Sequence, residues 1–177
     1  MGRVAWMDGT WSGTVTSATP AGKMTLLQTE RVGTMAGGTV RLVEGRGYAE
    51  NGSLEFNAVG MITYDALADE YVMTTTARGM ISQPWFRPTR RGFDWGFEAG
   101  PTKIRYVARY SEGVWTEDGF MAVEGQPERK FLTMRLERLG DTDWPEAGAV
   151  APELQLIKAP AFIDACRFVS AWTDRFE

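Results

Sequence analysis

Short runs of strand-forming residues, separated by turn residues, follow one another from Gly9 to Leu139. The separators, such as Asn51-Gly52 and Gly100-Pro101, tolerate positive φ or preset a turn. Runs at this spacing with no helical segment between them predict an antiparallel meander that closes on itself. We therefore expect an all-β fold, a closed antiparallel up-and-down barrel of about ten strands. The expected strands span residues 10–17, 22–34, 37–48, 53–64, 69–78, 80–87, 92–99, 102–110, 113–123 and 127–139.

Alternation within the runs supports strands rather than helices. Phe93, Trp95 and Phe97 fall on one face of their run, and Asp94 and Glu98 fall on the other. Such a period of two is typical of a strand with one buried face. A small barrel built from strands of this kind encloses either packed side chains or one ligand-sized cavity.

The chain divides into three parts by composition. Residues 5–139 are expected to form the barrel domain, and the acidic, Pro- and Gly-containing residues 140–159 a linker. Residues 160–176 are expected to form an amphipathic helix, because apolar side chains recur there at steps of three and four. This helix could pack on its own barrel, cap a barrel mouth or join a second subunit in a homodimer. Its apolar stripe consists of Phe162, Cys166, Val169, Trp172 and Phe176.

Composition excludes several classes of partner and site. A net charge of −4 argues against a general nucleic-acid or anionic-membrane surface. No apolar run approaches the ~20 residues that span a bilayer. The single cysteine, Cys166, rules out an intramolecular disulfide. The start lacks an apolar signal segment, so we expect a cytoplasmic protein as the chain stands, or a periplasmic or secreted one if a leader was removed.

The chain contains no histidine. That absence excludes a Ser-His-Asp triad, a Cys-His dyad and an imidazole metal site, and we expect no metal centre. Acid–base chemistry would fall to carboxylates, tyrosines or lysines. No spacing in the sequence specifies a reacting pair of carboxylates, so we assign no catalytic residue.

The segment from Trp6 to Gly13, with its Gly9-x-Trp11-x-Gly13 pattern, resembles the opening of lipocalin-like (calycin) barrels. It is most similar to nitrobindin-type ten-stranded barrels and to a related bacterial barrel family of unknown function. Thr29-Glu30, the run from Val43 to Arg46, the run from Ile62 to Asp65 and the run from Trp115 to Glu117 also look like that bacterial family. The resemblance covers about residues 5–139.

The resemblance implies a role for Trp11. In calycins this tryptophan closes one barrel end beneath an arginine of the last strand, which predicts a cation–π contact of Trp11 with Arg135 or Arg138. Nitrobindins hold haem iron through a histidine, which this chain lacks. We therefore expect no haem and no other cofactor.

Strand parity nominates polar residues for the barrel interior. Glu30, Arg46 and Glu117 each share parity with apolar neighbours, and we expect them to anchor a ligand if those faces point inward. The alternative is that the faces point outward, or that Glu44 and Arg46 pair with neighbouring side chains structurally. Apolar and aromatic walls would come from Tyr71, Met73, Trp95, Tyr106, Trp115 and Met134.

These residues favour a barrel that binds a small, mostly apolar molecule. Two other classes stay open: a carboxylate-dependent isomerase or hydrolase in the same cavity, and a packed barrel that acts only through protein contacts. One more segment, from Trp85 to Phe93, carries three arginines among aromatics. It could hold an anionic group, although an exposed hairpin tip with solvated arginines explains it as well.

Overall fold

The computed structural model describes residues 1–144, which form one antiparallel sheet of eleven strands and two short 3-10 helices. The fold is all-β, as expected. The helices are η1 (Gly2–Met7) and η2 (Ala36–Gly38). The strands are β1 (Gly9–Thr19), β2 (Gly22–Met35), β3 (Val40–Tyr48), β4 (Leu54–Asp65), β5 (Glu70–Ala77), β6 (Met80–Ser82), β7 (Trp85–Thr89), β8 (Gly92–Ala99), β9 (Thr102–Ser111), β10 (Val114–Val123) and β11 (Arg129–Gly140).

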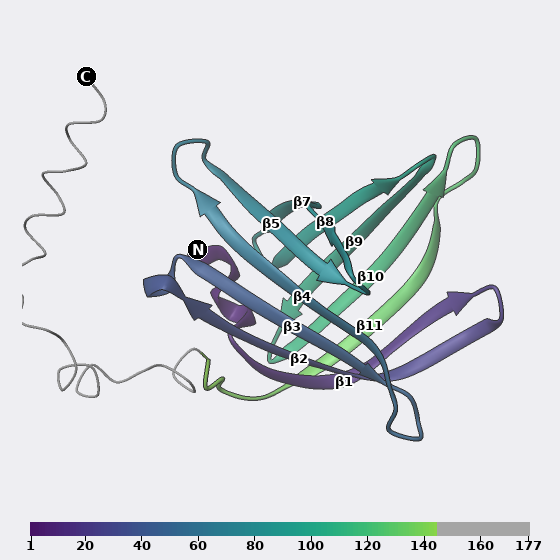
Figure 1. Cartoon of the computed structure of the whole chain (residues 1–177), viewed down its shortest axis with the longest axis horizontal. Coiled ribbons are helices and arrows are strands. Elements are labelled where there is room, and N and C mark those ends of the chain that lie inside the picture. Colours follow the sequence, from purple (N-terminus) through teal and green to yellow (C-terminus); the bar gives the residue numbers. More distant parts are fainter. Residues whose placement is uncertain (145–177) are drawn as a thin grey trace, which may run out of the picture. The chain divides into compact units, whose positions relative to one another are not determined.

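The sheet curves into an open half-barrel (Figure 1). Its strand order is β6-β5-β4-β3-β2-β1-β11-β10-β9-β8-β7, so every neighbour is a sequence neighbour except β1 and β11. The first strand thus pairs with the last, as a closed meander requires. The ladder ends at β6 and β7, however, and within residues 1–144 no hydrogen-bonded pairing joins these two strands. The closed barrel of ten strands is therefore not what this part of the chain forms.

The break at Gln83 and Pro84, between β6 and β7, accounts for the opening of the sheet. The sequence predicts one strand over residues 80–87, but the structure has two short ones: β6 pairs with β5, and β7 pairs with β8. Pro84 lies between them and has no N–H to give to a ladder, which confines proline to sheet edges and breaks. The two sides of the sheet still approach each other through side chains, since the rings of Tyr71 and Phe86 lie 6.2 Å apart.

A bulge in the last hairpin sets which side chains of β11 face inward. The register between β10 and β11 shifts between Gly119 and Phe120, so that Gly119 pairs with Leu132 and Phe120 with Lys130. The extra residue, Phe131, lets Lys130 stay on the outer face, where its Nζ lies 3.2 Å from Asp118. Leu132 shares the inner face with Met134 and Leu136, and the latter two are buried.

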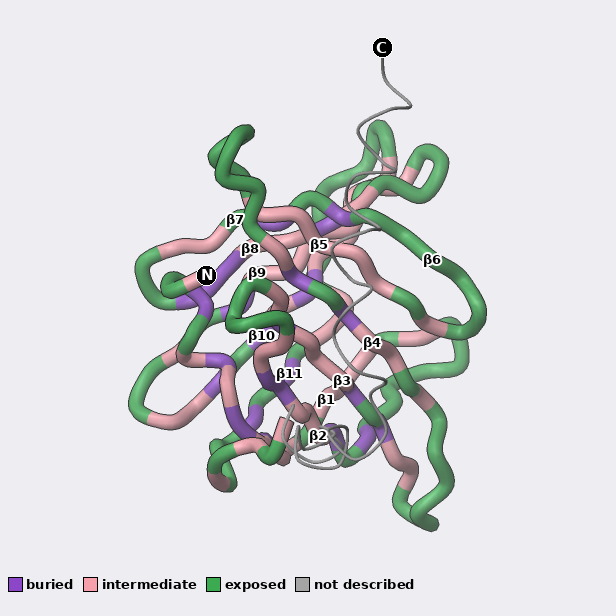
Figure 2. Tube along the Cα trace, turned by 60° about the vertical axis from the view of Figure 1, so that its left-hand side comes forward, coloured by how far each residue is buried: buried purple, intermediate pink, exposed green. Residues whose placement is uncertain are grey.

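The N-terminal segment fills one end of the half-barrel. Helix η1 contributes Val4 and Met7, both almost fully buried, and Trp6. An ion pair fixes the start of β1 beside it: Arg41 Nε and Nη2 donate to Asp8 Oδ1 and Oδ2 at 2.7 and 2.8 Å. Arg41 also donates to the carbonyl of Met1 at 3.2 Å. Figure 2 shows the buried residues concentrated on the strands and the exposed ones in the turns.

Most of the expected linker over 140–159 and the whole expected helix over 160–176 lie outside the described residues, and so does any homodimer contact through that helix. None of the helices within residues 1–144 has the length and apolar character that crossing a membrane demands.

Candidate functional site

Two carboxylates lie on the inner face of the half-barrel, on strands β2 and β10, which β1 and β11 separate in the sheet. Glu30 on β2 pairs with Trp11 of β1, which pairs in turn with Arg138 of β11. Glu117 on β10 pairs with Met134 of β11. Both carboxylates occupy inward positions of their strands, which is one of the two orientations that the sequence left open. The structure describes no ion pair for either of them within residues 1–144.

Glu30 is held by an amide and a glycine. Gln28, 4% exposed and also inward-facing, donates from Nε2 to Glu30 Oε1 at 2.7 Å. Across the ladder stands Gly45, where a Cβ would lie 2.7 Å from that same oxygen. Loss of hydration, opposed by the Gln28 hydrogen bond and reinforced by the charges of Glu117 and Glu44, raises the pKa of Glu30 from an ordinary 4.5 to about 8.

Glu117 is 8% exposed and accepts a hydrogen bond from the indole N–H of Trp95, with 3.3 Å between Nε1 and Oε2. Burial outweighs that hydrogen bond and raises the pKa of Glu117 from 4.5 to about 7. Burial, helped by the charge of Glu117, also raises the pKa of the Tyr106 hydroxyl. The site thus keeps two carboxyl groups that exchange protons near neutrality and one neutral phenol.

Aromatic rings stand beside Glu117. Trp95 on β8 and Tyr106 on β9 are register partners and stack with ring centroids 4.2 Å apart and planes 11° from parallel. The bulged Phe131 meets Tyr106 edge to face at 5.8 Å. Trp95, Tyr106 and Phe131 are only partly buried although they lie beside the interior. Solvent, or a small molecule, can therefore reach this part of the concave face.

The other end of the interior is packed with aromatic rings. Trp6 stacks on Tyr110 at 4.9 Å and meets Trp11 and Trp115 edge to face at 6.2 and 5.3 Å. Trp11 and Trp115 are 1% and 3% exposed. Trp115, predicted to line a ligand wall, lies in this packed cluster. Tyr71 and Met73, on β5, are partly buried and pack against the same core.

Arg46 lies on the outer face and not beside Glu30 and Glu117. Its Nε and Nη2 donate to Glu44 Oε1 at 2.9 and 2.6 Å, and its side chain is 48% exposed. The inward positions of β3 are taken by Arg41, Val43 and Gly45 instead, which is a one-residue difference in parity. Structural pairing with a neighbouring side chain is an alternative that the sequence left open, and Arg46 is not an interior anchor.

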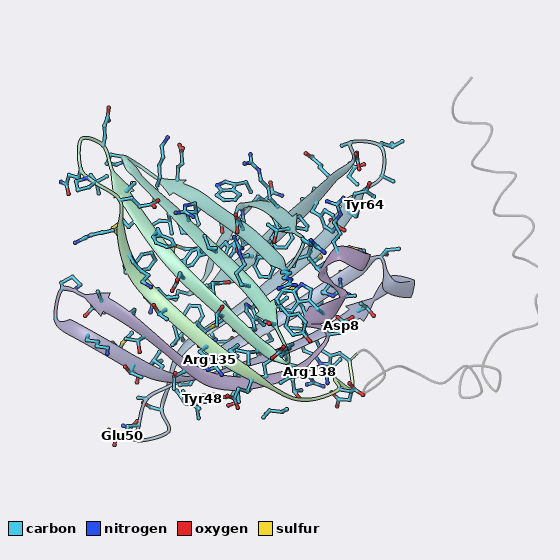
Figure 3. All side chains as sticks on the ribbon, turned by 180° about the vertical axis from the view of Figure 1, so that it is seen from behind. Asp8, Tyr48, Glu50, Tyr64, Arg135 and Arg138 are labelled. Carbon is cyan, nitrogen blue, oxygen red and sulfur yellow. The ribbon has the colours of Figure 1, made fainter. Side chains whose placement is uncertain are left out.

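The cation–π contact predicted between Trp11 and an arginine of the last strand is replaced by hydrogen bonds of Arg138. Arg138 is the register partner of Trp11, but its Nη2 donates to the carbonyl of Asp8 at 3.2 Å and to Asp141 Oδ1 at 2.5 Å. The Trp11 indole donates to the carbonyl of Met7 at 2.8 Å. The cation–π contacts within residues 1–144 do not include Trp11. Figure 3 shows Arg138 near Asp8 at the end of the half-barrel opposite Glu50.

Arg135, the other arginine considered for Trp11, is exposed and lies on the outer face beside Glu137. The arginine-rich segment from Trp85 to Phe93 forms the hairpin of β7 and β8. Arg90 and Arg91 are exposed at its turn, and Arg87 lies over the ring of Trp85 at 5.3 Å. This geometry is the solvated hairpin tip that the sequence offered as the simpler explanation.

Surface hollows also occur away from the two carboxylates. One of about 620 Å³ lies where the β1–β2 and β3–β4 hairpins meet and is lined by Leu27 and Tyr48, among others. Another, of about 320 Å³, lies near the β9–β10 turn and includes Arg109 and Arg135. Neither is lined by Glu30 or Glu117. The described residues contain no group of three or more acidic, Cys or His side chains suited to a metal ion.

Sequence reasoning missed Gln28, Gly45 and the Asp8–Arg41 pair. Gln28 could have been found, because it precedes Glu30 by two residues and so shares its face. Gly45 could not, since its importance comes from a carboxylate on the neighbouring strand. Trp6 precedes the first expected strand, and nothing in the period-two pattern places it inside the half-barrel.

Comparisons with known proteins identify the fold. No family model matches the chain, and no curated protein matches it. The crystal structure of Rv2717c from M. tuberculosis is similar, with a TM-score of 0.59 over 77% of this chain and 95% of that chain, at 13% sequence identity. At that identity the likeness shows a shared barrel-like fold, and it carries no information about the site.

Proposed function

We propose that this protein binds a small, mostly apolar molecule on the concave face of its half-barrel, beside Glu30 and Glu117. The aromatic wall of Trp95 and Tyr106 would hold the apolar body, and the carboxyl groups would orient one polar group. Met134, the register partner of Glu117, would extend the apolar surface, while Tyr71 and Met73 would border it from β5.

The observation that carries this proposal is the pair of inward carboxyl groups without a cationic partner in the described part of the chain. A buried carboxyl costs free energy unless it is hydrogen-bonded or paired, and each of these two accepts only one side-chain hydrogen bond there. Groups of raised pKa inside a concave, partly apolar surface are typical of binding sites. The opening motif at Gly9 and Trp11, which resembles calycin barrels, agrees with a ligand carrier and with a lipocalin-like or nitrobindin-like relationship.

Native mass spectrometry of protein purified from its own host tests the proposal, together with titration by N-phenyl-1-naphthylamine, a neutral apolar dye. We expect a co-purified small molecule and saturable dye binding that Trp95→Ala weakens. The matched control is Trp85→Ala, which removes a partly exposed tryptophan of the hairpin edge. Absence of both a co-purified molecule and saturable binding would contradict the proposal and favour a barrel that acts through protein contacts.

A second candidate function uses the same groups for chemistry. The pKa of Glu30 at about 8 and that of Glu117 at about 7 provide one proton donor and one proton acceptor on the inner face near neutral pH. That arrangement suits a carboxylate-dependent isomerase or hydrolase. An activity found by substrate screening that Glu117→Gln abolishes, with dye binding retained, would favour this candidate over a carrier.

A further inference from the structure

The concave face carries more acidic than basic side chains. Its titratable groups near the aromatic wall are Glu30, Glu117 and Tyr106, and Glu44 adds its charge from the outer face of β3. The inward arginines in the described residues are engaged elsewhere: Arg41 with Asp8 and Arg138 with Asp8 and Asp141. The donors that reach the two carboxylates are a neutral amide and a neutral indole.

From this imbalance we propose that the ligand carries a protonated amine on an apolar body, and that Glu117 and Glu30 bind its ammonium group. The inference rests on the proposed function and adds the chemical class of the ligand. An ammonium group donates up to three hydrogen bonds, which suits two carboxylates that each keep acceptor capacity.

The aromatic wall favours the same class of ligand. Electron-rich ring faces attract cations, and the stacked Trp95 and Tyr106 lie next to Glu117, with the Trp95 indole donating to that carboxylate. Glu117 is more than nine-tenths buried and points into this wall. A carboxylate-bearing ligand would instead meet two like charges, so fatty acids are expected to bind poorly once the site is ionised.

Binding of an amine is coupled to proton release. Without ligand, burial holds Glu30 and part of Glu117 in their protonated forms at neutral pH, and the charge of Glu117 adds to the effect on Glu30. A bound ammonium stabilises the ionised forms, so both carboxyl groups give up their remaining protons. The affinity for an amine therefore rises as the pH increases from 6 to 8, where a basic alkylamine stays charged.

Calorimetric titration with 1-naphthylmethylamine, 1-naphthylmethanol and 1-naphthoic acid tests the inference, because the three probes differ only in their polar group. At pH 7 we expect the amine to bind at least tenfold more tightly than the alcohol, and the acid to bind most weakly. The amine should also release protons, seen as different heats in phosphate and Tris buffers. Glu117→Gln should bring the amine down to the affinity of the alcohol, whereas Glu137→Gln, an outer-face control, should change neither.

The outcomes separate this inference from the proposed function. Equal binding of all three probes, or an amine affinity that falls from pH 6 to pH 8, would contradict the inference that the ligand is an amine. Neither result would contradict the proposed apolar binding site. No binding of any probe would overturn both. If Glu117→Gln does not fold, the pH dependence and the proton release of the unaltered protein decide the matter by themselves.

Discussion

Burial raises the pKa of Glu30, and the charge of Glu117 adds to this rise across the interior of the half-barrel, although the two residues belong to β2 and β10. The strands come together because β1 pairs with β11, which places the first and last hairpins side by side. Each carboxylate retains one neutral hydrogen-bond donor, Gln28 or Trp95. The pair therefore carries strain that is electrostatic in origin, and the stability of the fold reports on it.

The stability of the ligand-free protein should fall as the pH rises. Both carboxyl groups bind protons more tightly in the folded state, with pKa values of about 8 and about 7, than at the ordinary 4.5 of the unfolded chain. The folded state therefore holds more protons between pH 4.5 and 8, and its advantage is complete below 4.5 and lost above 8. At about 1.4 kcal/mol per pKa unit, shifts of this size amount to a loss of up to about 8 kcal/mol in the free energy of unfolding between pH 4.5 and 8.

Urea unfolding at pH 5 and pH 8 measures this loss. Glu30→Gln should flatten the dependence, because the amide has no proton to exchange, and should raise the stability at pH 8 relative to the unaltered protein. Glu137→Gln, which removes an exposed carboxylate, should leave the slope as it is. An equally steep loss of stability in Glu30→Gln would show that Glu30 is not the group responsible.

The ion pair between Arg41 and Asp8 should matter far more to stability than the one between Arg46 and Glu44. Arg41 is 2% exposed and makes a bidentate contact that ties the N-terminal segment to β3. Arg41→Met leaves the Asp8 carboxylate without its partner and should lower the free energy of unfolding by about 3–5 kcal/mol. Arg46→Met, on the exposed outer face, should cost much less. Similar losses in the two variants, measured by urea unfolding, would contradict this assignment.

The two buried tryptophans of the packed end should respond differently to loss of the indole nitrogen. The Trp11 indole donates to the Met7 carbonyl at 2.8 Å, whereas the buried Trp115 Nε1 has no hydrogen-bond partner among residues 1–144. Trp11→Phe removes the ring nitrogen and leaves the Met7 carbonyl without its indole donor. It should therefore lower the free energy of unfolding by about 1–3 kcal/mol more than Trp115→Phe. Thermal unfolding followed by circular dichroism provides the comparison, and a larger loss in Trp115→Phe would refute it.

Gly45 should be required for the position of Glu30. Because a Cβ at Gly45 would lie 2.7 Å from Glu30 Oε1, Gly45→Ala pushes the carboxylate away from its place beside Gln28. We expect weaker dye binding and an altered Glu30 pKa, measured by carboxyl carbon NMR. Gly140→Ala serves as the control, since nothing lies within 4 Å of a Cβ at that position. Unchanged binding and pKa in Gly45→Ala would show that the glycine has no such role.

The sequence predicted the strands well because alternation and turn residues are local signals. Nine of the ten expected runs correspond to single strands with ends displaced by a few residues. The remaining run, 80–87, divides at Pro84 into two strands with different partners. Apolar residues stand on both sides of Ser82-Gln83-Pro84, and the missing N–H of the proline marks the break between the two strands. The opening of the sheet was therefore not predicted.

Site residues were predictable to the extent that parity alone positions them. Glu30 and Glu117 face inward because their strands alternate without interruption. Parity does not fix the orientation of Arg46, because both faces of β3 carry apolar residues and Leu42 and Val43 give no preference for one face. The Asp8–Arg41 pair joins distant segments through a salt bridge, and no short-range pattern announces such a contact.

The indole N–H signal of Trp95 offers the most direct test of binding on the concave face. In a ¹⁵N-labelled sample, with the signal assigned through Trp95→Phe, titration with N-phenyl-1-naphthylamine should shift this cross-peak most among the tryptophan indoles, because the indole nitrogen lies between the aromatic wall and Glu117. The backbone signals of Leu27 and Tyr48, in the hollow between the hairpins, should stay in place. Shifts confined to that hollow, or a Trp95 signal that does not move at saturating dye, would contradict the account.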